Sequence, residues 1–259
     1  MTKLQVKLFL NIVFLIFYLS GTNADTIVEF RYSGFDFRID TRSEGFFTGN
    51  ITVKEKGNTV FSMDSTFTSY VDHKFIDLDK NGKKELALYL TDGASPYVFH
   101  YLYIFDGEKG PKPLFMLLNG EIDSTDKELP LLTVNSRMSP AVLGLWYNWY
   151  LQYKNGRLSY FNPDKKRKQS VRPDYEFVNE ALKDLKENNQ TCDDFAYDVF
   201  FEYIFLCSKI AGEENEAEEY FNKNYLCPEK TAALKRFKNY AADNLKWIKD
   251  EENYIYSEY

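Results

Sequence analysis

The order of hydrophobic and polar residues divides the chain into three stretches. An apolar run extends from Leu8 to Leu19, and short segments with period-two alternation fill residues 25 to about 163. From residue 173 onward, apolar residues recur every three to four positions. Alternation predicts strands and the longer period predicts amphipathic helices. The sequence therefore predicts an α+β protein, with an N-terminal antiparallel β domain at residues 25–163 and a C-terminal α-helical bundle at residues 173–259.

The β half contains an internal repeat on the scale of a propeller blade. The series begins with an Ile-Asp pair at Ile76 and continues with an apolar stretch, a proline, an aromatic strand and a turn. It begins again 46 residues later at Ile122. The aromatic strands are expected near residues 99–105 and 145–153. Turns are expected at Lys56-Gly57-Asn58, Asn81-Gly82, Asp106-Gly107 and Asn155-Gly156. A four-stranded blade has this length, but residues 25–163 hold only about three blades, too few for a closed ring. We expect blade-like hairpins in an incomplete, propeller-like set whose exposed edges must be covered.

Four helices are expected after Pro173. The strongest pattern runs from Ala196 to Ala211, with an N-cap expected from Thr191 together with Asp194 and a C-terminal Gly212. The last helix begins near Pro228. Short connections favour antiparallel packing, and such a bundle could cover an edge of the β domain.

The first segment has the order of a secretory signal. Lys3 and Lys7 precede the apolar run, and small residues end at Ala24. Because the run is shorter than the roughly 20 residues that span a bilayer, residues 1–24 predict a cleaved signal and no stable membrane anchor afterwards. We expect an exported protein, either periplasmic or secreted. The basic run inside residues 164–172 is expected to be a solvated linker between the two halves.

Charge and residue usage exclude several functions. Without residues 1–24 the chain carries 30 basic and 39 acidic residues, a net charge of −9. This balance argues against nucleic acid as a partner. Only two histidines are present, His73 and His100, and no nucleophile, phosphate-loop or zinc-protease motif occurs. These features favour a non-enzymatic protein.

One loop is a candidate metal site. Oxygen-bearing side chains stand at loop positions 1, 3, 5 and 9, which are Asp77, Asp79, Asn81 and Glu85. Such oxygens suit a hard cation, a backbone carbonyl at position 7 would complete the shell, and Gly82 permits a sharp turn. Position 12 is Leu88 rather than the Glu of an EF-hand, and both flanks are strand-like.

The loop resembles the calcium loop of FG-GAP and VCBS-type repeats, in which the same spacing leads directly into a β-strand. The resemblance covers about residues 75–107 and implies that Asp77, Asp79, Asn81 and Glu85 hold calcium in a structural role. Lys80, Lys83 and Lys84 depart from an acidic loop and would weaken the affinity. The other interpretation is a tight hairpin turn at Asn81-Gly82 with solvated acids around it. The second repeat copy, at residues 123–126, has lost the glycine and the spacing, so it is assigned no metal.

The three cysteines all lie in the helical half. An odd number in an exported protein suggests one pair and one free thiol. Cys192 opens the second helix and Cys227 follows the third, so a disulfide between them is favoured over three reduced thiols. Cys207 falls on an apolar helix face and is expected to be a buried thiol.

The sequence leaves three functions open. The leading hypothesis is an exported binding or structural protein with a calcium loop, whose partner would be an unknown protein or a glycan. One aromatic strand face can stack sugars or accept a protein, although burial against the helices is the alternative; it carries Trp146, Asn148, Tyr150 and Gln152. The second hypothesis is an inhibitor or immunity-type protein that acts on an exported enzyme. The third and weakest is a carboxylate-based hydrolase.

Overall fold

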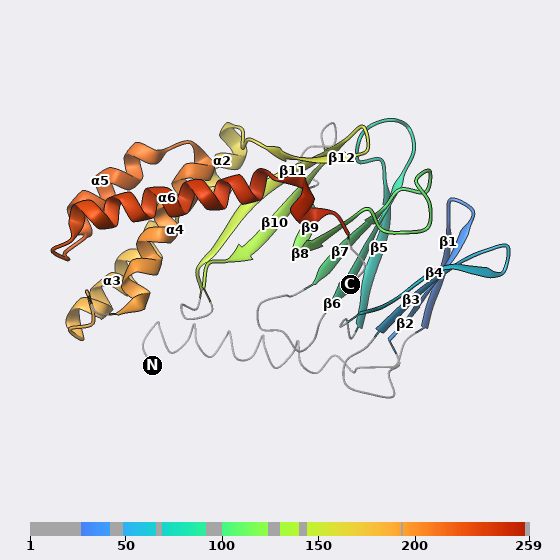
Figure 1. Ribbon diagram of the computed structural model, residues 1–259, viewed down its shortest axis with the longest axis horizontal. Helices are drawn as coiled ribbons and strands as arrows, with labels where there is room; N and C mark the ends of the chain where they lie inside the picture. Colours follow the sequence, from blue (N-terminus) through green and yellow to red (C-terminus); the bar gives the residue numbers. More distant parts are fainter. Residues whose placement is uncertain are drawn as a thin grey trace.

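In the computed structural model, three antiparallel four-stranded sheets and a group of helices follow one another along the long axis (Figure 1). The structure describes residues 27–41, 49–65, 69–91, 100–123, 130–139, 144–192 and 194–256. The expected signal segment, residues 1–24, lies outside these residues. The α+β class, the N-terminal sheets and the C-terminal helices are confirmed, and the described strands form no closed barrel.

The first sheet consists of two tight hairpins in chain order. Its strands are β1 (Ile27–Tyr32), β2 (Phe35–Asp40), β3 (Gly49–Glu55) and β4 (Asn58–Ser65). The turn between β3 and β4 uses Lys56 and Gly57, both at positive φ (50° and 85°). Two consecutive positive φ angles give the turn type whose twist matches that of the flanking strands. The predicted turn at Lys56-Gly57 is therefore a hairpin connection.

The two copies of the sequence repeat each build one further sheet. The second sheet contains β5 (Ser69–Ile76), β6 (Glu85–Thr91), β7 (Tyr101–Phe105) and β8 (Phe115–Leu118). The third contains β9 (Gly120–Asp123), β10 (Leu131–Arg137), β11 (Trp146–Lys154) and β12 (Arg157–Phe161). Both sheets have their strands in chain order, and the two Ile-Asp pairs mark the ends of β5 and β9.

The central strands of the second sheet, β6 and β7, are buried on both faces. Along β6, Leu86, Leu88 and Leu90 belong to a hydrophobic cluster shared with the first sheet. The alternate residues Ala87 and Tyr89 belong to a larger cluster that continues through the third sheet into the helices. Because successive strand residues point to opposite faces, this one sheet joins the two hydrophobic cores of the molecule.

The basic segment expected to be a solvated linker is a packed helix, α2 (Lys165–Val171). The Asp164 side chain caps it by accepting a hydrogen bond from the backbone N–H of Arg167 at 2.9 Å. The guanidinium of Arg167 is only 4% exposed, and its Nε donates to Asp123 Oδ2 at 3.0 Å. This pairing, with a residue 44 positions earlier, is the physical reason why Arg167 is buried, whereas Lys165 and Lys166 are exposed.

The remaining helices surround α4. They are α3 (Tyr175–Glu187), α4 (Phe195–Ala211), α5 (Glu214–Asn224), α6 (Lys230–Lys249) and the short 3₁₀ helix η1 (Glu251–Tyr254). Asp194 caps the start of α4, and Gly212 ends it in the left-handed region at φ 69°. Twelve of the 17 residues of α4 are buried, so this helix forms the centre of the bundle. Aromatic rings of α4, α5 and α6 meet there, with Phe201 stacked on Phe237 at 5.9 Å.

The chain after α6 returns to the sheets and covers an edge (Figure 1). Ile255 forms an antiparallel bridge with Phe115 of β8, the edge strand of the second sheet. The ring of Tyr256 then lies 6.4 Å from that of Phe61 and 6.2 Å from that of Tyr103. The tail thus touches the first and second sheets together, a role that the sequence analysis assigned to the helices alone.

We expect a chain that ends at Tyr254 to lose about 2–4 kcal/mol of unfolding free energy, because it uncovers apolar surface and a strand edge. Urea denaturation measures this loss. The substitution Tyr256→Ala should produce most of it, whereas Tyr256→Phe, which keeps the ring, should produce much less. Equal stability of the shortened and full chains would contradict the assignment.

Candidate metal centre

The loop between β5 and β6 folds its acidic side chains inward onto its own backbone. The two carboxylate oxygens of Asp77 accept hydrogen bonds from the N–H groups of Asn81 (3.0 Å) and Gly82 (2.9 Å). Asp79 Oδ1 accepts from the same Asn81 N–H at 3.2 Å. Gly82 has φ 87° and Lys80 has φ 60°, so the backbone reverses within this loop. The sharp turn expected from the sequence is therefore present.

This fold brings three of the four predicted ligands together. A carboxylate oxygen from each of Asp77, Asp79 and Glu85 lies within 4.8 Å of the other two. The Oδ1 atom of Asn81 accepts a hydrogen bond from the N–H of Lys83 at 2.7 Å. Since an amide oxygen has two lone pairs, that bond leaves one for a second partner.

Glu85 is the buried member of the cluster, with 2% of its surface exposed. Its Oε2 accepts a hydrogen bond from the N–H of Leu78 at 2.7 Å. Burial and, to a smaller extent, the nearby carboxylates of Asp79 and Asp106 raise the pKa of the Glu85 carboxyl to about 7. The fold thus brings to this position a carboxylate that water does not solvate.

No basic side chain of the described residues neutralises the cluster. Among these residues, no lysine or arginine forms an ion pair with Asp77, Asp79 or Glu85. The Lys83 ammonium, which the sequence analysis expected to weaken cation binding, pairs with Glu108 of the β7–β8 turn instead. The negative charge of these three carboxyl groups therefore has no basic partner among the described residues.

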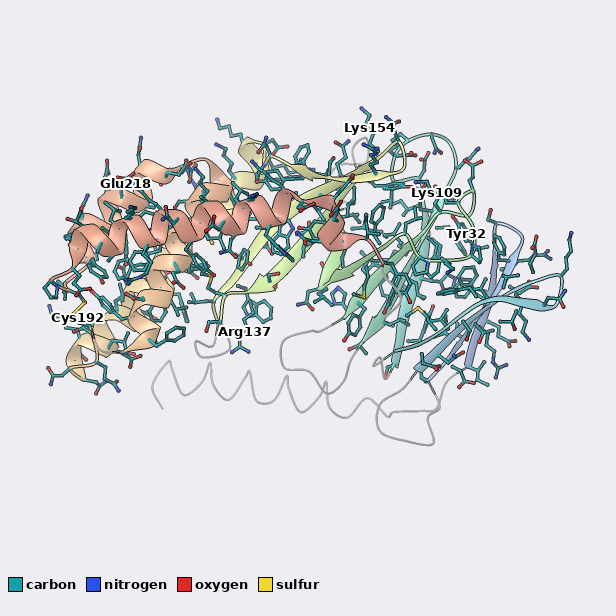
Figure 2. All side chains as sticks on the ribbon, viewed as in Figure 1. Tyr32, Lys109, Arg137, Lys154, Cys192 and Glu218 are labelled. Carbon is teal, nitrogen blue, oxygen red and sulfur yellow. A yellow bond between two sulfur atoms is a disulfide. The ribbon has the colours of Figure 1, made fainter. Side chains whose placement is uncertain are left out.

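Side chains from the other two sheets reach the same place. The hydroxyl of Tyr32, from β1, lies 2.8 Å from the carbonyl oxygen of Lys84 and accepts from the N–H of Gly107 at 2.9 Å. Figure 2 shows Tyr32 between the first and second sheets. The hydroxyl of Tyr153, from β11, donates to Asp106 Oδ2 at 3.2 Å. The sequence analysis identified Asp106 only as a turn residue, so its proximity to the cluster was missed.

The equivalent position in the third sheet is neutralised differently. Asp123 follows Ile122 as Asp77 follows Ile76, and its carboxylate receives the Nε–H of Arg167 at 3.0 Å. Arg167 also pairs with Asp164, at 2.5 Å from Nη1. An internal cation thus satisfies the carboxylate of the copy that was assigned no metal.

The cysteines and histidines lie away from this loop or take no part in it. Cys192 and Cys227 form a disulfide across a sequence separation of 35, at the end of the helical region farthest from the sheets (Figure 2). Cys207 is a buried free thiol, and burial raises its pKa. The ring of His73 stacks on Phe30 at 4.0 Å, in the contact between the first and second sheets.

A scan against protein-family models, a search of curated proteins and a search of solved structures each found no match to this chain. Among the described residues, no helix has both the length and the apolar character needed to span a membrane.

The Glu85 carboxyl predicts a pH dependence in the presence of a chelator. Its pKa rises from 4.5 to about 7 on folding, so between these values the folded state holds more protons than the unfolded state. The contribution of Glu85 to the unfolding free energy should therefore be largest below about pH 4.5. It should fall as the pH rises through 7, by up to about 3 kcal/mol. Denaturation in chelator across this range measures the slope. Glu85→Gln should flatten it, and an unchanged slope in that variant would assign it to other groups.

The disulfide predicts a redox-dependent stability. In a chain-entropy description, a cross-link over this separation stabilises by about 3–4 kcal/mol, which the paired substitution Cys192→Ser with Cys227→Ser should remove. Thiol counting of the oxidised, unfolded protein should find one reactive thiol, Cys207, and three after reduction. Three thiols before reduction would rule out the pairing.

Proposed function

We propose that this is an exported, non-enzymatic binding or structural protein whose β5–β6 loop binds calcium. The observation that carries the proposal is the convergence of carboxylate oxygens from Asp77, Asp79 and Glu85 within 4.8 Å, without a basic partner among the described residues. Uncompensated carboxylates at such a spacing repel one another, and a divalent cation between them removes the repulsion.

The donor set selects the type of cation. All the proposed side-chain ligands, Asp77, Asp79, Asn81 and Glu85, offer oxygen, and the set contains neither the imidazole nor the thiolate that zinc and copper favour. Calcium accepts six to eight oxygens in irregular shells, whereas magnesium keeps a strict octahedron with several waters. A short loop that supplies oxygens from adjacent backbone and side-chain positions is therefore better suited to calcium.

The burial of Glu85 supports a structural ion over a catalytic centre. A hydrolase that uses two carboxylates must expose its acid to the substrate, but this carboxyl is only 2% exposed. The loop would supply most of the six to eight oxygens that calcium accepts, so that few positions of the shell would remain for a substrate. Because Tyr32 and Asp106 lie against the same loop, the ion would hold the three sheets in place.

The disulfide supports the proposed compartment. Disulfides persist in oxidising environments such as the periplasm or the extracellular space, and Cys192 pairs with Cys227. Extracellular calcium modules bind with dissociation constants of about 10⁻⁴–10⁻³ M, which fits a loop with lysines between its ligands. We therefore propose a weak, structural calcium site in an exported protein.

Thermal unfolding with millimolar calcium and with a chelator tests the site. Calcium at ten times its dissociation constant should stabilise the fold by about 1.4 kcal/mol. Asp79→Asn removes one ligand charge and should weaken calcium binding by about tenfold in calorimetry. Asp243→Asn, a matched change at an exposed position on α6, should leave binding unchanged. Identical melting temperatures with and without calcium, and no heat of binding, would refute the proposal.

A further inference from the structure

A hollow of about 280 Å³ lies against the third sheet, on the side where the second sheet adjoins it. Every residue that lines it is polar: His100, Asn119, Glu121, Thr133, Asn135 and Asn148. We propose that this hollow binds a saccharide unit, an uncharged ligand whose hydroxyl groups both donate and accept hydrogen bonds. The site is separate from the calcium loop and does not depend on it.

The strand register places four of these side chains on one face. Thr133 of β10 pairs directly with Glu121 of β9, and Asn135 pairs with Asn148 of β11. Directly paired residues of antiparallel strands project to the same side, and so do residues two positions apart on one strand. The sheet itself therefore gathers these polar groups, and their spacing is fixed by backbone hydrogen bonds.

Two more residues complete the hollow: His100, directly before β7, and Asn119, directly before β9. The N–H of Asn119 donates to the carbonyl of His100 at 2.8 Å, and the N–H of Asn135 donates to the carbonyl of Asn119 at 3.2 Å. The His100 Nε2 lies 2.8 Å from the carbonyl oxygen of Gly120. Because a carbonyl only accepts, Nε2 carries a proton and is the donor in this contact.

Hydrogen bonds inside the hollow hold its amides in place. Asn135 Nδ2 donates to Asn148 Oδ1 at 2.6 Å, and Asn148 Nδ2 donates to the carbonyl of Ser170 on α2 at 3.1 Å. This chain fixes both side-chain orientations and leaves the Asn135 carbonyl oxygen as an acceptor. Groups that are already ordered lose little entropy when a ligand binds.

Other polar groups of the hollow are available to a ligand. Among the described residues, neither the Glu121 carboxylate nor the Thr133 hydroxyl has a hydrogen bond or an ion pair, and Glu121 is exposed. With the Asn135 oxygen, these groups make the hollow rich in hydrogen-bond acceptors. It therefore selects a ligand rich in hydrogen-bond donors.

The lining excludes other ligand classes. A phosphate or nucleic acid needs basic groups, and no lysine or arginine lines the hollow. A metal ion needs several ligating groups together, and the one cluster of three acids among the described residues is at the β5–β6 loop. An apolar ligand would leave the Glu121 carboxylate and the Thr133 hydroxyl without a hydrogen-bond partner.

Ligand-observed NMR and calorimetry on the oxidised full chain test the site, with glucose, galactose, mannose and N-acetylglucosamine as probes. At least one should bind with a dissociation constant of about a millimolar, the affinity of a small ligand with few hydrogen bonds. Glu121→Gln removes the charge and should weaken binding about tenfold. Thr133→Val removes the hydroxyl at nearly constant shape and should weaken it about threefold.

The matched control is Glu180→Gln, at an exposed position on α3, which should bind the same sugar as the parent chain does. All three variants should unfold at the parent temperature, so that a loss of binding is a property of the hollow. No binding to any of the four sugars would overturn the proposal. Binding of methylammonium chloride in their place, with the same sensitivity to Glu121→Gln, would assign the hollow to a cationic ligand and would also overturn it.

Discussion

The second sheet depends on partners on both of its faces, and the rest of the molecule is arranged to supply them. In a closed propeller each blade packs between two others, but three four-stranded sheets form an open row. The first sheet covers one face of β5–β8, and the third sheet covers the other. The third sheet in turn needs a partner, which the helices provide because their core is continuous with it. The bundle therefore takes the place of the blades that would complete a ring.

At the other end of the row, the first sheet carries charged side chains that pair with one another. On β2, Arg38 pairs with Glu29 at 2.8 Å and with Asp40 at 3.1 Å. Such exposed pairs contribute little to stability, but charged groups on a sheet surface discourage the stacking of another sheet. The row thus begins with a polar surface and ends with a helical bundle, while the tail with Ile255 and Tyr256 covers the edge strand β8 between them.

The same packing brings the loops of three sheets to one place. Gly107 has no room for a side chain, because a Cβ there would lie 2.2 Å from the Cβ of Ser33 in the β1–β2 turn. Lys109, two residues on, donates from Nζ to the carbonyl of Gly156 in the β11–β12 turn at 2.7 Å (Figure 2). A ligand that orders the β5–β6 loop would act on this junction, and therefore on the angles between the sheets.

Features fixed by neighbouring residues could be predicted from the sequence, and features fixed by distant residues could not. The turn at Lys56-Gly57, the end of α4 at Gly212 and the inward fold of the acidic loop all follow from local backbone preferences. Asp106 joins the loop only because β7 pairs with β6, which places Phe105 opposite Leu86. Arg167 stands in a basic run that is typical of a solvated segment, and its partner Asp123 lies 44 residues earlier.

The two repeat copies show two ways to stabilise an aspartate at the end of a blade's first strand. At Asp123 the chain supplies a guanidinium, and the paired Arg167 is nearly inaccessible to water. Removing one partner of such a buried pair leaves an uncompensated charge and is strongly destabilising. Among the described residues, no basic side chain pairs with Asp77, although the carboxylates of Asp79 and Glu85 lie close to it. A calcium ion at the first copy, as proposed above, would occupy the place that the Arg167 guanidinium occupies at the second.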